Sequence, residues 1–173
     1  MRVGMIEKED AKGEALSCYE GQVKKYGRIT NMKKTLLNDT DSFKLLMEWY
    51  PMRDKVAAIV GGFATDIFAH AISTANECLI CSTFFRRLLK DNGRDPDNLV
   101  LTQVEQLLAD FGLACVVQPV KVSDELFARM KKVFNDQEIV ILTSFAGIMI
   151  ATNLINNALE VPIDDYLTPY TKR

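Results

Sequence analysis

The sequence predicts an all-α protein built from many helices, and two observations support this fold class. Residue types that favour helices dominate the chain, whereas glycine and proline are few, 9 and 5 of 173 residues, and fall mostly between apolar segments. Apolar residues recur at steps of three and four, which is the spacing of one helix face. The stretch ACVVQPVKV, residues 114–122, is the one candidate for extended chain, and Pro119 makes it a connection rather than a central strand.

Capping residues place the helices along the chain. Asp95 followed by Pro96 is typical of a helix start, Ser123 can cap the helix after it, and Asn135 with Glu138 resembles a capping box. The expected helices span residues 8–26, 30–38, 41–53, 54–75, 79–91, 96–111, 123–134 and 136–160.

Charge and hydropathy exclude two classes of partner. The 21 lysines and arginines are balanced by 23 acidic residues and are scattered, so we expect no nucleic acid and no membrane as a partner. The most apolar stretch, residues 139–155, is shorter than the roughly 20 residues that span a bilayer, which predicts a buried helix. The chain opens on charged residues rather than on an export signal, so a cytoplasmic protein is expected.

Two titratable side chains interrupt the apolar segment 54–75. Asp66 and His70, the single histidine of the chain, are one helical turn apart and can meet on one face. Burial of either group without a partner is unfavourable, so each needs a role. They either take and relay a proton, or form a structural pair in which Asp66 satisfies a core histidine.

The motif CLIC, from Cys78 to Cys81, follows this segment after an expected turn at Asn76 and Glu77. Such a turn places both cysteines at the start of the next helix, where free backbone N–H groups and the helix dipole lower a thiol pKa. Two cysteines at this spacing can also close a disulfide. One sulfur can therefore attack a peroxide or disulfide while the other discharges it.

Other interpretations of these residues stay open on the sequence alone. The two cysteines of the motif can be small, unreactive core side chains. A metal clip is a further reading, which would join them to His70 and to Asp66 or Glu77. Cys18 and Cys115 stand alone and are interpreted as packed thiols.

The stretch ATDIFAHAISTANECLICSTFF resembles the central motif of the carboxymuconolactone decarboxylase superfamily, in its alkyl hydroperoxidase D-like branch. That motif has an acidic residue, a helix that ends in Ser-x-x-Asn-x-Cys, and Cys-x-x-Cys opening the next helix. The stretches GRITNMKKTLLNDTDSFKLL and EIVILTSFAGIMIATNLINNALEVPID are similar to the segments that flank it. The resemblance covers residues 27–165 and leaves 1–26 as an N-terminal helical extension of a single helical domain, 1–173. It implies an alkyl hydroperoxidase D-like multihelical bundle and a homo-oligomer.

The resemblance also implies roles for individual residues. In the peroxidases of this branch the second cysteine attacks the hydroperoxide and the first resolves the product, which implies Cys81 as nucleophile and Cys78 as resolver. The family's acidic residue falls at Asp66. The histidine that follows the second cysteine in the family is Phe85 here, so the usual proton relay is missing and His70 is the available substitute.

The expected function is a thiol-dependent, peroxidase-like oxidoreductase that reduces an organic hydroperoxide or a disulfide through Cys78 and Cys81. We expect a small-molecule substrate, a thiol or dithiol reductant, and no cofactor or metal. The alternative is a non-catalytic helical oligomer that acts as a redox sensor or partner-binding scaffold, because Phe85 replaces the histidine. Phe84 and Phe85 are interpreted as core residues in preference to the wall of a substrate pocket.

Overall fold

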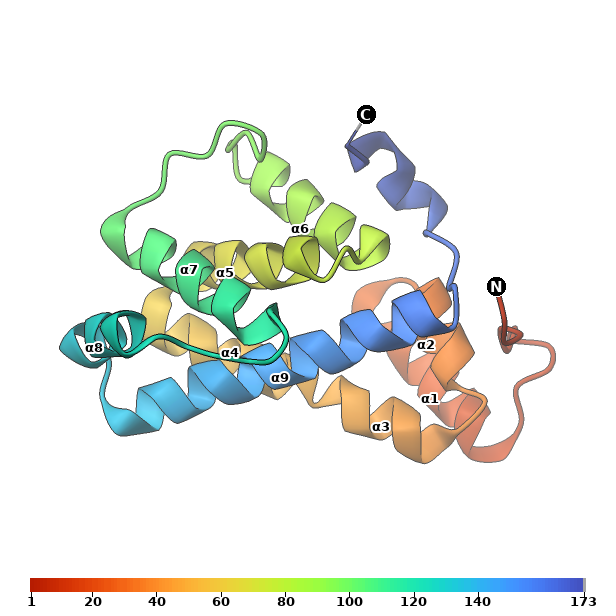
Figure 1. Cartoon of the computed structure of the whole chain (residues 1–173). Helices are drawn as coiled ribbons and strands as arrows, with labels where there is room; N and C mark the ends of the chain where they lie inside the picture. Colours follow the sequence, from red (N-terminus) through yellow and green to blue (C-terminus); the bar gives the residue numbers. More distant parts are fainter. Residues whose placement is uncertain (173) are drawn as a thin grey trace.

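The computed structural model describes residues 1–172 and folds most of them into helices, with no strand in that range (Figure 1). The predicted all-α fold class is therefore confirmed. In chain order the elements are α1 (Gly13–Tyr26), α2 (Asn31–Leu36), α3 (Thr40–Met47), α4 (Trp49–Val60), α5 (Gly62–Ala75), α6 (Leu79–Asp91), α7 (Gln103–Val116), α8 (Asp124–Val133), α9 (Asp136–Ala158) and a short 3-10 helix, η1 (Asp165–Tyr170).

Helix α5 lies at the centre of the bundle because most of its residues are apolar. It packs against α4, α6, α7 and α9, and its residues Phe68 and Ile72 are fully buried. The Phe68 ring lies 6.1 Å from the ring of Phe111 on α7 and 5.9 Å from that of Phe145 on α9, measured between centroids. Gly112 lets α7 approach closely, since a Cβ there would lie 3.0 Å from Ile72 Cγ1 and 3.1 Å from the Phe68 ring.

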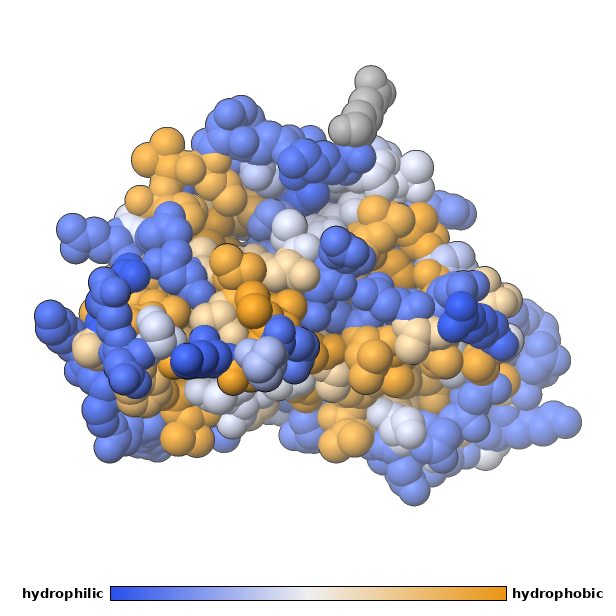
Figure 2. All heavy atoms as spheres, viewed as in Figure 1, coloured by the Kyte–Doolittle hydropathy of each residue, from blue (hydrophilic) through white to orange (hydrophobic). Residues whose placement is uncertain are grey.

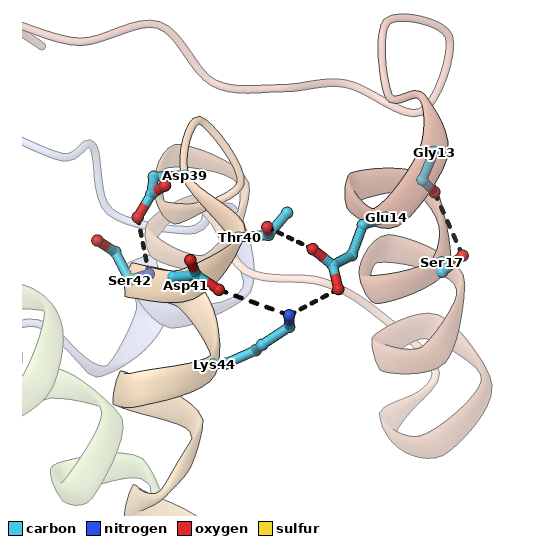
Figure 3. Close-up of polar contacts among 8 residues, drawn as sticks. All are labelled: Gly13, Glu14, Ser17, Asp39, Thr40, Asp41, Ser42 and Lys44. Carbon is cyan, nitrogen blue, oxygen red and sulfur yellow. Dashed lines mark hydrogen bonds and ion pairs between the residues drawn. The ribbon is translucent and has the colours of Figure 1, made fainter.

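A second hydrophobic cluster joins the N-terminal segment to α2, α3 and the end of α9. Its buried members are Ile29, Leu36, Leu37, Phe43 and Leu46. At its edge Glu14 of α1 accepts hydrogen bonds from Thr40 Oγ1 at 2.7 Å and Lys44 Nζ at 2.6 Å (Figure 3). The Asp39 side chain caps α3 by accepting from the Ser42 backbone N–H at 2.8 Å. The segment expected as an N-terminal extension therefore packs against its own chain.

The expected helix boundary between residues 53 and 54 is wrong. The chain is helical through both positions, as part of α4, and the break comes at Gly61. Gly61 has φ 84° and ψ 155°, a backbone conformation that side-chain-bearing residues rarely adopt. A second break, at Glu48, separates α3 from α4 inside the segment expected as one helix.

The helix start expected at Asp95 and Pro96 is also wrong. The Asp95 carboxylate accepts from the Asp97 backbone N–H at 3.0 Å and from Asn98 Nδ2 at 2.8 Å, which closes a turn instead of opening a helix. Helix α7 begins at Gln103 behind a capping box of Thr102 and Glu105, and it runs on to Val116. Residues 114–116, the first part of the stretch expected as a connection, therefore belong to the end of this helix.

The caps expected for the last two long helices are confirmed. Ser123 accepts from the backbone N–H of the third residue of α8, and Asn135 with Glu138 forms a capping box at the start of α9. By length and composition α9 is the one helix of the described chain that could cross a membrane. It packs against α4, α5, α7 and α8, with Phe145 and Met149 in the core, as expected for a buried helix.

Candidate active site

The turn between α5 and α6 positions the two cysteines. Its sharpest residue is Glu77, whose φ of 52° lies in the left-handed region. The backbone N–H of Cys78 then donates to the Ser73 carbonyl at 3.0 Å. Cys78 is the N-cap of α6, and Cys81 lies in the first turn of that helix. The sequence predicts both this turn and this helix start, and the structure confirms them.

Asn156 of α9 connects the two sulfurs. Its Nδ2 lies 3.2 Å from Cys81 Sγ and 3.8 Å from Cys78 Sγ, within donating distance of both. Both cysteines are free thiols, and all three residues are buried. The Oδ1 atom of Asn156 accepts no hydrogen bond from any part of residues 1–172. This amide can therefore stabilise a thiolate and offers an acceptor beside it.

The protonation of the two thiols is linked. The pKa of Cys78 is lowered to about 7, first because Cys78 accepts a hydrogen bond from the Cys81 thiol, and further by the backbone N–H groups of Cys81 and Ile80 and by the Asn156 amide. The pKa of Cys81 is raised, because this thiol donates that hydrogen bond and is buried beside the Cys78 sulfur. Within the pair, a thiolate is therefore favoured on Cys78.

The cysteine that lines the cavity is not the one with the lowered pKa. Cys81 lies in the wall of a cavity of about 110 Å³, whereas Cys78 is fully buried and does not line it. The aromatic residues of this wall are Trp49, Tyr50, Phe84, Phe85 and Tyr166. A molecule in the cavity would therefore contact Cys81, whereas Cys78, on which the thiolate is favoured, does not line the cavity.

Both phenylalanines of the motif contribute to this wall. Phe85 is also a member of the main core, and its ring meets that of Phe84 edge to face at 5.2 Å. Phe84 and Phe85, expected to be core residues, therefore also form part of the cavity wall. Trp49 completes this side of the wall, and its Nε1 donates to Met149 Sδ at 2.8 Å.

Asp66 is buried beside an arginine and away from the sulfurs. Its Oδ1 accepts from Arg53 Nη2 of α4 at 2.8 Å, and the Arg53 guanidinium lies 5.9 Å from the Trp49 ring centroid. Burial raises the pKa of Asp66, and the Arg53 charge and hydrogen bond oppose that rise. Within residues 1–172, no hydrogen bond or ion pair joins Asp66 to His70 or to either cysteine.

His70 lies in a different electrostatic environment from Asp66. The pKa of His70 is lowered to about 4, first by burial and then by the positive charge of Arg86. The negative charge of Asp97 opposes this shift. The imidazole is therefore neutral near pH 7. Arg86 itself is a structural link, since it makes two hydrogen bonds to Asp97, at 2.8 and 2.7 Å, and one to the Tyr170 carbonyl at 3.1 Å. The proton-handling role expected for His70 and Asp66 stays a prediction.

The structure also locates the two cysteines outside the motif and bears on the metal interpretation. Cys115 is buried in the main core, and burial raises the pKa of its thiol to about 11, as expected for a packed side chain. Cys18 is partly buried, and burial raises its thiol pKa too. Across the described chain, no group of three His, Cys, Asp or Glu side chains lies close enough to hold a metal ion.

Lys33 of α2 is a site residue that the sequence analysis missed. It lines the same cavity as Cys81, and 5% of its surface is exposed. Its Nζ donates to Gln22 Oε1 at 2.6 Å and to Tyr50 Oη at 2.7 Å. Burial lowers the pKa of this ammonium group to about 8. The surrounding sequence, NMKKTLLND, is polar enough that Lys33 looks like a surface lysine, so only the fold reveals its burial.

Replacing Lys33 by methionine is expected to stabilise the protein at neutral pH, by on the order of 1 kcal/mol. The pKa of Lys33 is about 8 in the folded protein and 10.5 for an ordinary lysine. Its charged form therefore destabilises the fold by the full amount below pH 8, and this penalty fades between pH 8 and pH 10.5. Urea unfolding of wild type and Lys33→Met at pH 7 and pH 10 measures this, with the gain expected to shrink at pH 10. An equal loss of stability at both pH values would contradict it. Lys34→Met, which removes an ion pair to Glu7, is the matched control.

The fold and the site define an all-helical bundle with a Cys-x-x-Cys pair at the start of a helix, beside an apolar cavity. Solved structures confirm the fold. The chain is similar to an alkylhydroperoxidase AhpD core, an uncharacterized peroxidase-related protein from Ralstonia eutropha JMP134. The TM-score is 0.77 at 16% identity, over 96% of this chain and 93% of that one.

Two further solved structures are similar over almost their whole length. An uncharacterized peroxidase-related protein from Silicibacter sp. TM1040 has a TM-score of 0.75 at 15% identity, over 96% of this chain and 92% of that one. Debrominase Bmp8, in a cysteine-to-alanine form in complex with 2,3,4-tribromopyrrole, has a TM-score of 0.77 at 14% identity, over 98% and 95%. Neither a protein-family model nor a curated protein matches the sequence. At these identities the likeness establishes the fold and leaves the activity open.

Proposed function

We propose that the protein is a thiol-dependent oxidoreductase that reduces a small organic hydroperoxide through Cys81 and Cys78. The observation that carries this proposal is the arrangement of the two sulfurs. Both lie within donating distance of the Asn156 amide, their protonation is linked, and Cys81 is the one of the two that lines the cavity. The likeness in fold to peroxidase-related proteins supports the same reaction class.

The reaction begins with transfer of a proton from Cys81 to the Cys78 thiolate, which leaves the thiolate on the sulfur that faces the cavity. Cys81 Sγ attacks the terminal oxygen of the hydroperoxide: an S–O bond forms, the O–O bond breaks, and the alkoxide takes the proton from Cys78 to become an alcohol. Cys78 Sγ then attacks Cys81 Sγ and displaces hydroxide, which takes a solvent proton to become water. The disulfide returns to two thiols by exchange with a thiol or dithiol reductant.

Asp66 and His70 have indirect roles in this proposal. The Asp66 carboxylate holds Arg53 against the Trp49 ring of the cavity wall, which positions that wall. His70 is neutral near pH 7, and its lowered pKa makes it a weak base there. Because no hydrogen bond joins either residue to a sulfur within residues 1–172, the Cys78 thiol is the proton donor of the proposed step.

A second candidate function is reductive removal of a halogen from a small aromatic compound. The aromatic lining of the cavity favours it, and the chain shares its fold with debrominase Bmp8. The same two sulfurs suffice: the Cys81 thiolate attacks the halogen, an S–halogen bond forms and the carbon–halogen bond breaks, and the ring carbon takes the proton of the Cys78 thiol. The Cys78 thiolate then attacks Cys81 Sγ, displaces halide and forms the disulfide. Release of bromide from 2,3,4-tribromopyrrole by the reduced protein would separate this reaction from hydroperoxide reduction.

The proposed setting is the cytoplasm, where cellular reductants keep the four cysteines reduced between turnovers. We also propose that the chain forms a homo-oligomer. Several large apolar side chains are exposed, among them Leu113, Val117, Val140 and Leu154. Figure 2 shows hydrophobic residues on the surface among hydrophilic ones. Association would cover part of this surface.

The proposed function is tested by adding cumene hydroperoxide to the reduced wild-type protein without any other thiol. We expect about one equivalent of hydroperoxide to be consumed, with loss of two free thiols and formation of a Cys78–Cys81 disulfide. Thiol titration and peptide mass spectrometry measure both, and Cys18 and Cys115 should stay reduced. Unchanged thiols after prolonged incubation would eliminate hydroperoxide reduction.

A further inference from the structure

A buried lysine in the wall of the cavity needs a physical explanation. Lys33 is 5% exposed, and an ammonium group is stable in such a place only when other groups replace the water it has lost. In the part of the chain that the structure describes, no carboxylate lies within ion-pairing distance of Lys33 Nζ. The charge is therefore buried without a direct counter-charge.

The neutral groups around Lys33 satisfy only part of its hydrogen-bonding capacity. An ammonium group has three donors, and two of them reach Gln22 Oε1 and Tyr50 Oη. The Nζ atom also lies 4.7 Å from the Tyr26 ring centroid and 5.0 Å from that of Tyr50, which adds a favourable cation–π contact. These partners fix the position of the ammonium group, and within residues 1–172 the third donor makes no hydrogen bond.

Gln22, which does not line the cavity, is oriented by a second contact. Gln22 donates its Nε2 to Met47 Sδ at 3.7 Å, so its Oε1 is the atom that faces Lys33. Asp164 is the acidic residue of the cavity wall, and its charge acts on Lys33 from beyond ion-pairing distance. Its Oδ1 already accepts from the backbone N–H of Asn31 at 2.9 Å. Burial raises the pKa of Asp164, which weakens its ability to serve as the missing anion.

Lys33 and Cys81 line one cavity, whose wall is mostly aromatic and aliphatic. We propose that this cavity binds small aromatic carboxylates, with the carboxylate on Lys33 Nζ and the aromatic ring against the side chains that lead to Cys81. The inference names the substrate class of the proposed oxidoreductase and rests on it for the reaction. The proposed binding of a carboxylate does not depend on that reaction.

The test is binding of benzoate and of benzamide, a neutral molecule of almost the same shape. Trp49 is the single tryptophan of the chain and lies in the cavity wall, so its fluorescence reports occupancy directly. We expect the reduced wild-type protein to bind benzoate about tenfold or more tightly than benzamide, because a charge-assisted hydrogen bond forms with one of them only. In Lys33→Met this preference should disappear.

The matched control is Lys25→Gln. Lys25 is an exposed lysine that lies 5.7 Å from the same Tyr50 ring but outside the cavity wall, so its removal takes away a nearby charge and leaves the preference for benzoate intact. Thermal unfolding of each variant verifies that it is folded. The inference would be overturned if wild type bound benzoate and benzamide equally, or if it bound neither of them. A preference for benzoate that survives Lys33→Met would overturn it as well.

This experiment is independent of the peroxidase reaction. It uses no hydroperoxide, so the anion site can be found in a protein that proves inactive toward cumene hydroperoxide. Conversely, an active peroxidase that ignores benzoate would keep the proposed function and lose the proposed substrate class. If both hold, a hydroperoxide that carries a carboxylate should react about tenfold faster at low concentration than its methyl ester, and only in proteins that retain Lys33.

Discussion

Replacing Cys81 by serine is expected to abolish hydroperoxide consumption, whereas replacing Cys78 by serine should still allow a single slow turnover. Only Cys81 Sγ lines the cavity, so its loss removes the sulfur that can meet the substrate. Without Cys78 the remaining thiol loses its proton acceptor and its resolving partner, and the reaction stops at the sulfenic acid. The difference between the two variants in the first turnover should be about a hundredfold or more.

Trapping with dimedone followed by mass spectrometry measures this difference. The adduct is expected on Cys81 in Cys78→Ser and on neither remaining motif cysteine in Cys81→Ser. Cys115→Ser is the matched control, because Cys115 is also buried but has a raised thiol pKa and lies in the main core. A dimedone adduct on Cys78 in Cys81→Ser would reverse the assignment of nucleophile and resolver.

Arg53→Met is expected to lower the free energy of unfolding by about 3 kcal/mol, because it leaves the Asp66 carboxylate buried without its cation. The side chain of Asp66 is 6% exposed, and Arg53 is its ion-pair partner at 2.8 Å. Loss of Arg53 should raise the pKa of Asp66 further. The penalty is then largest at neutral pH and fades as the pH falls toward the ordinary carboxyl value of 3.8, where the folded and unfolded chains both bind the proton.

Urea unfolding of wild type, Arg53→Met and the double variant Arg53→Met/Asp66→Leu measures this effect. The double variant should recover most of the lost stability, because no charge is left buried. If Arg53→Met alone were as stable as wild type at pH 7, the pair would be a surface interaction of little weight. In that case the positioning role proposed for Asp66 would fall with it.

Local sequence patterns predicted the helices and much of the dithiol geometry. The helix expected at 79–91 matches α6, because the turn residues before Cys78 and the apolar spacing after it agree. The error at Asp95 has a local cause, since an aspartate before proline can cap a helix or close a turn, and the choice depends on the residues it meets. The break at Gly61 depends on a positive φ that the sequence alone does not reveal.

The cavity could be predicted only in part because its residues come from distant segments. Asn156 gave a signal, a polar side chain on an apolar helix, but the sulfurs it contacts lie more than 70 positions earlier. Asp66 and His70 share a helix face by spacing, yet tertiary contacts take Asp66 to Arg53 and place His70 near Arg86. Side-chain spacing predicts which groups can meet, whereas packing decides which do.

The close crossing of α5 and α7 at Gly112 restricts how related chains can diverge. A methyl group at this position would meet Phe68 and Ile72 at once, and both are fully buried with no free space to move into. We therefore expect alanine at 112 to arise in evolution only together with a smaller side chain at 68 or 72. Such compensating exchanges would keep the helix that leads into the cysteine turn at its present depth.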